Sequence, residues 1–134
     1  MATIQRFEDI EAWKRARQLT KGVYDASKLS KFARDFGLKD QIQRAAVSIM
    51  SNIAEGFERG GNQEFVQYLA TSKGSCGEVR SQLYVALDQG YIDEQLFGEL
   101  YRNAEAISKM LSAFMDYLKK SGMRGPKYRK VDEP

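Results

Sequence analysis

Apolar residues recur every three or four positions through most of this chain, in four long runs separated by short polar or glycine-containing stretches. This spacing is typical of amphipathic α-helices that bury their apolar faces in one core. The runs cover roughly residues 7–28, 38–58, 62–89 and 94–118. Because short loops between long helices make neighbours antiparallel, the pattern predicts an all-α protein, an antiparallel up-down-up-down four-helix bundle.

Glycine and aspartate mark the expected helix ends. The Gly60-Gly61 pair should end the second helix, and Gly61 should cap the third, with Glu64 in its first turn. Asp93 is the expected N-cap of the fourth helix. Residues 121–134 have glycine, proline and charged residues without periodicity, so we expect a bundle domain over 1–120 and a short, disordered basic tail over 121–134.

The third helix is unusually rich in small residues. Each glycine inside a helix costs about 1 kcal/mol relative to alanine, so these positions need an explanation. We favour close packing against another helix, in the same chain or another subunit, over backbone contact with a ligand. The small residues are Ser72, Gly74, Ser75, Gly77 and Ser81.

Composition indicates a single globular domain. The chain has 134 residues, 43% hydrophobic and 29% charged, and its two prolines both lie in the tail. No apolar run is long enough to cross a bilayer, so no membrane partner is expected. The lone Cys76 cannot form an internal disulfide and the N-terminus lacks a signal-peptide core, which favours a cytoplasmic location.

Charge is unevenly distributed along the chain. Residues 1–60 contain 11 basic and 8 acidic residues, residues 61–118 contain 4 and 8, and residues 119–134 contain 6 and 2. Opposite charges on two halves of a small domain suit head-to-tail self-association. Chance distribution over solvated faces is the alternative.

Catalytic chemistry finds little support in the sequence. Histidine is absent, which excludes the usual Glu-x-x-His di-metal site of helical bundles. Cys76 lies at a core position without a histidine to activate it. We therefore expect no enzyme activity, catalytic residue, metal or cofactor. A magnesium-dependent nucleotide hydrolase using Glu55, Glu58 and Glu78 is the least favoured alternative.

Binding is the better supported class of function. The first helix interleaves cations with Trp13 and Tyr24, a mixture that can neutralise phosphates and stack on bases, and the tail adds further cations. The alternative is a solvated helix face and a tail that aids solubility, in a purely structural or protein-interaction oligomer. The candidate residues for binding RNA or DNA are Lys14, Arg17, Lys21, Lys127, Arg129 and Lys130.

A polar stripe follows the second helix at spacings of three and four. On a lone bundle this stripe faces water. In an oligomer it becomes a hydrogen-bonded interface, in which Arg44 or Arg59 pairs with Glu55 or with the partner subunit's Glu78. The residues predicted for the oligomer interface are Arg44, Ser48, Asn52, Glu55, Gly74 and Gly77.

Several motifs together resemble one bacterial family of four-helix bundles, first noticed as proteins encoded in intervening sequences of 23S ribosomal RNA genes. The resemblance covers nearly all of the chain from Phe7 to Lys120. The matching stretches are Phe7-Glu8-Asp9-Ile10-Glu11-Ala12-Trp13, Phe36-Gly37-Leu38 with Gln41, Arg44-Ala45-Ala46 with Ser48-Ile49, Asn52-Ile53-Ala54-Glu55-Gly56-Phe57, Glu64-Phe65, Gly74-Ser75 with Glu78, and Gly90-Tyr91-Ile92.

This resemblance implies a four-helix bundle that assembles into a ring-like homopentamer. It also implies a distant kinship with the accessory proteins of diversity-generating retroelements, basic pentameric bundles that bind nucleic acid and a reverse transcriptase. No catalytic residues come with the resemblance. The chain departs from the family in having Met50 where proline is common and Gly61 where a serine N-cap is common.

Overall fold

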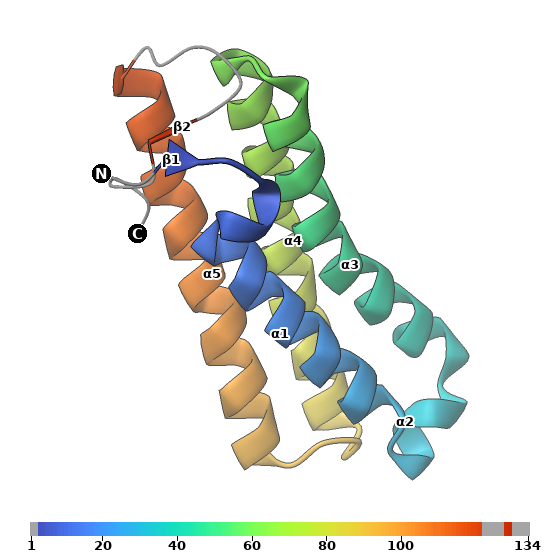
Figure 1. Cartoon of the computed structure of the whole chain (residues 1–134). Helices are drawn as coiled ribbons and strands as arrows, with labels where there is room; N and C mark the ends of the chain where they lie inside the picture. Colours follow the sequence, from blue (N-terminus) through green and yellow to red (C-terminus); the bar gives the residue numbers. More distant parts are fainter. Residues whose placement is uncertain (1–2, 122–127, 130–134) are drawn as a thin grey trace.

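The computed structural model describes residues 3–121 and 128–129. Its four long helices are α1 (Glu11–Ser27), α3 (Phe36–Arg59), α4 (Asn62–Asp88) and α5 (Glu94–Ser121). They alternate in direction along the bundle (Figure 1), with α4 packed against both α3 and α5, and α1 packed on the same two helices. The predicted antiparallel four-helix bundle is confirmed.

Four short elements complete the described part of the chain. They are β1 (Thr3–Ile4), the 3-10 turn η1 (Phe7–Asp9), α2 (Ser30–Arg34) and β2 (Tyr128–Arg129). The two strands pair antiparallel, with Ile4 opposite Tyr128. Ser121, the first residue of the predicted tail, is the last residue of α5. The rest of the predicted tail, apart from Tyr128–Arg129, lies outside the described residues.

The core is built on the periodic apolar positions. Phe65 lies at its upper end and makes edge-on ring contacts with Phe57 and Phe114, at centroid distances of 6.1 and 5.3 Å. Helix α1 has 17 residues against 28 in α5. The segment before α1 continues the core above it, because Ile4 and Ile10 are fully buried (Figure 1).

The first predicted helix is interrupted near its start. The Asp9 carboxylate accepts hydrogen bonds from the backbone N–H groups of Gln5 (3.1 Å) and Arg6 (3.2 Å), which closes η1 as a separate turn. Ile10 is extended, with φ −78° and ψ 122°, and turns its side chain into the core. The prediction of one continuous helix from Phe7 is therefore wrong over this stretch.

The short helix α2 was not predicted. Phe32 anchors it, because its ring is buried and stacks on Tyr91 with centroids 5.4 Å apart. Asp35 then starts α3 two residues earlier than predicted, since its carboxylate accepts the backbone N–H of Leu38 at 3.1 Å.

Glycines shape the contact between α3 and α4. Gly60 ends α3 with φ +87° and Gly61 caps α4, as predicted. The close approach of the two helices is at Gly56, where an added Cβ would lie 2.7 Å from the Cβ of Tyr68. Packing within the chain does not explain the glycines of α4. A Cβ added at Gly74 would meet no atom within 4 Å, and one added at Gly77 would meet only an Arg80 side-chain nitrogen, at 3.7 Å.

Candidate nucleic-acid interface

Three of the predicted nucleic-acid contacts lie together on the outer face of α1. The buried side of this helix carries Ala12, Ala16, Leu19 and Val23, and spacings of three and four place the cations on the opposite side. They line a groove of about 390 Å³. The residues of this groove, called the α1 groove below, are Trp13, Lys14, Arg17, Gln18 and Lys21.

Trp13 forms the aromatic wall of the α1 groove. Its ring is half-buried and is held by the edge of Phe7, with centroids 5.2 Å apart and planes at 65°. An aromatic wall beside cations is an arrangement that can hold a phosphate next to a stacked base.

Two of the three cations in the α1 groove are paired with carboxylates. The Lys14 amine lies 3.2 Å from Glu11 and the Lys21 amine lies 2.9 Å from Asp25. The hydrogen bond from Lys21 lowers the pKa of Asp25 below its ordinary value. Arg17 takes part in none of the ion pairs found among the described residues. A bound phosphate would thus compete with two exposed carboxylates for this groove.

The other predicted contacts lie in the tail. Lys127 and Lys130 are outside the described residues. Arg129 is described only through its backbone, which pairs with Thr3 in the short sheet. That these tail residues bind nucleic acid therefore stays a prediction.

Most of the predicted oligomer interface lies along the contact of α3 with α4, and its polar groups are paired within the chain. Asn52 donates to the carbonyl oxygen and the hydroxyl of Ser48, at 2.8 and 2.9 Å, and the Ser48 hydroxyl lies 3.0 Å from that of Ser75. Arg44 pairs with Asp40 at 2.9 Å, on the same helix. We call Ser48, Asn52, Glu55, Tyr68 and Ser75 the α3–α4 seam.

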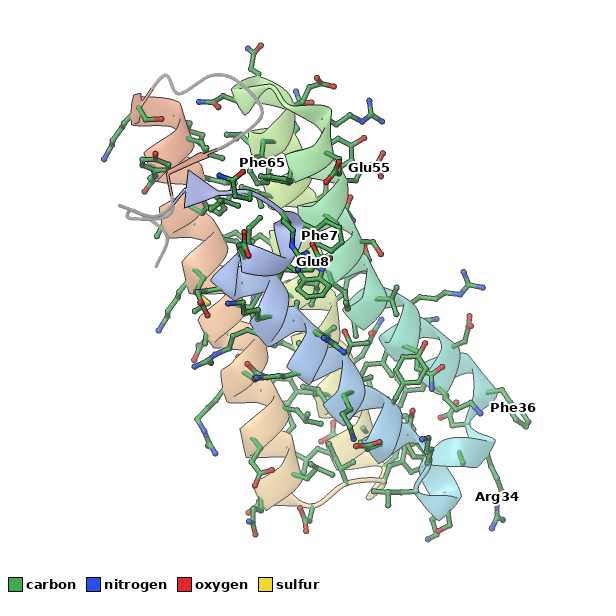
Figure 2. The ribbon with its side chains drawn as sticks, in the orientation of Figure 1. Phe7, Glu8, Arg34, Phe36, Glu55 and Phe65 are labelled. Atoms are coloured by element: carbon green, nitrogen blue, oxygen red, sulfur yellow. The ribbon has the colours of Figure 1, made fainter. Side chains whose placement is uncertain are left out.

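Glu55 is held at the end of this seam where α3 meets the turn (Figure 2). It pairs with Arg59 at 2.9 Å and accepts the Tyr68 hydroxyl at 3.1 Å. These two hydrogen bonds, the one from Arg59 first, lower the pKa of Glu55. Arg59 also lies over the ring of Tyr68, 5.4 Å from its centroid. The predicted pairing of Arg59 with Glu55 thus occurs within one chain.

The carboxylates considered for magnesium are not brought together. Among the described residues, no three acidic or cysteine side chains are grouped so that they could hold a metal ion, Glu55, Glu58 and Glu78 included. Cys76 is fully buried, as predicted, and burial raises the pKa of its thiol to about 12. Nor does any described helix combine the length and apolar character that a membrane span requires.

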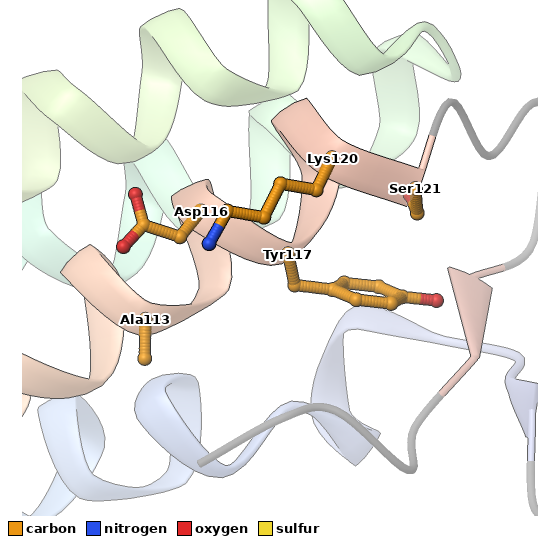
Figure 3. Close-up of a pocket in the computed structure, with 5 residues that line it drawn as sticks. All are labelled: Ala113, Asp116, Tyr117, Lys120 and Ser121. Atoms are coloured by element: carbon orange, nitrogen blue, oxygen red, sulfur yellow. The ribbon is translucent and has the colours of Figure 1, made fainter.

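A second hollow lies at the C-terminal end of α5. It measures about 480 Å³ and offers one carboxylate, Asp116, and one amine, Lys120 (Figure 3). The hydroxyl of Tyr117 is shielded from solvent and lacks a hydrogen-bond partner among the described residues. This hollow shares no lining residue with the α1 groove.

A further basic surface, which was not predicted from the sequence, lies where α2 meets α3. Phe36 and Arg34 project from the lower end of the bundle (Figure 2), and both are exposed, as is Lys31 on the same short helix as Arg34. An aromatic residue among closely spaced lysines and arginines in the stretch 28–39 was the available signal. We call this surface the α2–α3 corner, and its residues are Leu29, Lys31, Arg34, Phe36 and Lys39.

Comparison with known proteins places the chain in a family. The model of the 23S rRNA-intervening sequence protein family matches residues 8–113, so the chain belongs to this family of helical bundles. The resemblance seen in the sequence is thereby confirmed, whereas the distant kinship with retroelement accessory proteins stays a prediction. A search of curated proteins finds no match.

A solved structure shares the fold. It is a protein of unknown function from the S23 ribosomal protein family of Bacteroides thetaiotaomicron VPI-5482, with a TM-score of 0.73. It is 19% identical in sequence, and the match covers 78% of this chain and 97% of the other. At this identity the likeness shows the fold alone.

Proposed function

We propose that this chain acts by binding rather than by catalysis: it forms a homo-oligomer that binds RNA or DNA, or a nucleoprotein partner such as one that contains a reverse transcriptase. The observation that carries the proposal is the α1 groove, where three cations and an indole ring line one exposed surface. Cations neutralise phosphates and aromatic rings stack on bases.

The pentameric state is proposed from the family resemblance, and the outer face of α3 and α4 supports assembly. Between Arg44 and Glu55, α3 carries no charged residue, and Val47 on this stretch is 38% exposed. On α4, Gly74 is exposed and would meet no neighbouring atom within 4 Å. Helix surfaces that lack charged residues suit the centre of a contact between subunits. A cytoplasmic location completes the proposal.

Assembly is tested by Gly74→Leu, which adds a large side chain where the chain itself has room. We expect sedimentation to show a smaller particle than for the unaltered protein, with helix content unchanged. Ala113→Leu, at an exposed position of α5, is the matched control and should leave the particle mass as it was. An unaltered protein that sediments as a monomer would refute the oligomer.

Nucleic-acid binding is tested with a fluorescent single-stranded RNA of mixed sequence. The triple variant Lys14→Ala, Arg17→Ala, Lys21→Ala should bind at least tenfold more weakly at low salt, because it removes three phosphate contacts. Arg15→Ala, Arg102→Ala, Lys109→Ala removes the same charge from exposed positions outside the groove and is the control. Equal losses in both variants would mean that the groove has no special role.

A purely structural oligomer is the alternative. It is favoured if the unaltered protein assembles but binds neither RNA nor DNA at low salt.

A further inference from the structure

An aromatic side chain is exposed at the α2–α3 corner to an unusual degree. Phe36, the first residue of α3, is 73% exposed, and no other exposed large apolar side chain in the described part of the chain exceeds 50%. Leu29, seven residues earlier at the start of α2, is 46% exposed. Exposing this much apolar surface is unfavourable in water, and a partner that covers the ring would remove that cost.

The corner is rigidly built. On one side Phe32 is buried and stacks on Tyr91, which fixes α2 to the bundle. Between the two helices, one oxygen of Asp35 accepts the Leu38 N–H and the other accepts the Tyr91 hydroxyl at 2.9 Å. Phe36 therefore projects from a fixed backbone, which lowers the entropy that a partner must offset on binding.

The cations of the corner are available to an anion. Residues 28–39 contain four cations and one carboxylate, that of Asp35, which is already occupied. None of the ion pairs found among the described residues includes Lys31, Arg34 or Lys39. The neighbouring acids are engaged elsewhere, since Asp25 pairs with Lys21 and Asp40 with Arg44.

We propose that the α2–α3 corner binds unpaired nucleic acid, with a base stacked on Phe36 and the adjoining phosphates on Lys31, Arg34 and Lys39. The Lys39 amine lies 5.6 Å from the centroid of the Phe36 ring, so the cation and the ring form one unit. A strand with exposed base faces and regular negative charge complements both features. The inference rests on the proposed nucleic-acid function and adds a second contact and a strand preference to it.

The ring sets the preference for single strands. In a duplex the base faces are stacked on one another, so a duplex meets only the cations of the corner. An acidic protein surface would also pair with the cations, but its contact with Phe36 would depend on the apolar area of the side chain and not on its planar ring. These differences make the three partners separable by experiment.

The test measures binding of a labelled single-stranded RNA and of its duplex to four single variants. Phe36→Ala should weaken single-strand binding by on the order of tenfold and duplex binding by less than twofold, since one stacked base is lost. Phe36→Tyr should bind as the unaltered protein does, whereas Phe36→Leu should behave as Phe36→Ala. Tyr84→Ala removes another exposed ring, 50% exposed on α4, and is the matched control.

A spectroscopic readout tests stacking directly. A 2-aminopurine base in the single strand should be quenched on binding to the unaltered protein and to Phe36→Tyr, but not to Phe36→Leu. The variant Lys31→Ala, Arg34→Ala, Lys39→Ala should reduce the slope of log affinity against log salt by about 2.

The outcomes separate this inference from the proposed function. If RNA binding depends on the α1 groove but none of the Phe36 variants changes it, the corner is not a contact and the inference alone fails. Full single-strand affinity with Phe36→Leu overturns stacking in favour of an apolar contact. Loss of oligomer mass with Phe36→Ala assigns the corner to a second copy of the chain and also overturns the inference. If the unaltered protein binds no nucleic acid at low salt, the proposed function itself fails.

Discussion

The α3–α4 seam and the α1 groove have the same sequence pattern, but the polar groups of the seam are paired with a neighbouring helix and those of the groove are exposed. Both are stripes of polar residues spaced by three and four along an amphipathic helix. In the seam, the neighbouring helix α4 supplies hydrogen-bond partners to α3, as Ser75 does for Ser48. In the groove, Lys14 and Lys21 have only exposed carboxylates of their own helix, and Arg17 has no ion pair among the described residues.

The difference between paired and exposed polar groups distinguishes residues that stabilise the bundle from residues that can bind a ligand. Polar groups that a neighbouring helix satisfies add to the stability of the bundle and fix how the helices meet. Exposed cations add little to stability and remain available to a ligand. We therefore expect changes in the seam to be seen in unfolding, and changes in the groove to be seen in binding.

The largest effect on stability is expected from Gly56→Ala. The new methyl group would lie 2.7 Å from the Cβ of Tyr68, so α3 and α4 must move apart, at a cost of about 2 kcal/mol. Gly74→Ala is the control, because this helical glycine has open space and alanine should stabilise by up to about 1 kcal/mol. Urea unfolding measures both, and a Gly56→Ala protein more stable than the parent would disprove the close contact.

A smaller loss is expected from Ser75→Ala. It removes one hydroxyl partner of Ser48 while Asn52 still donates to that residue, so the free energy of unfolding should fall by about 1 kcal/mol. The measurement is again urea unfolding. A loss too small to detect would show that solvent replaces the hydroxyl and that the seam is open.

Lys21→Ala should have less effect on stability than Gly56→Ala or Ser75→Ala. Its ion pair with Asp25 is exposed to solvent, and exposed pairs contribute little to stability. The same substitution should still weaken RNA binding. A loss of stability larger than that of Ser75→Ala would contradict the comparison.

The smallest effect is expected from Glu55→Gln, and it depends on pH. Because the pKa of Glu55 is lowered in the folded protein from its ordinary value of 4.5, the carboxylate stabilises the fold above that pH and loses its contribution as pH falls through the folded value. The parent should thus be slightly more stable than the variant at neutral pH, and the difference should vanish in acid. A stability difference that grows in acid would show that the pKa of Glu55 is not lowered by folding, and would contradict the prediction.

The long helices could be predicted from the sequence because each buries many periodic positions. Helix α2 could not be predicted, since its 5 residues are too few to show a period. Its position depends on the packing of one ring, Phe32, against Tyr91, which is distant in the sequence. The break at Ile10 likewise depends on the Asp9 carboxylate closing η1.

The candidate site was predictable in part. Lys14, Arg17 and Lys21 share a face by spacing alone, and Asp25 lies at i+4 from Lys21, so even that ion pair was visible in the sequence. The Ser48–Ser75 contact was not, because α4 has small residues on several sides and its rotation about its own axis is fixed only by packing. From the sequence alone, Phe36 would be assigned to the core because it is a large apolar residue. Only the fold shows that it is exposed.

The salt dependence of RNA binding by the unaltered protein tests the central claim most directly. If open cations on this bundle bind phosphates, log affinity should fall linearly with log salt, with a slope of about −2 or steeper from the three groove cations alone. Binding that does not change with salt, or no binding at low salt, would contradict the account.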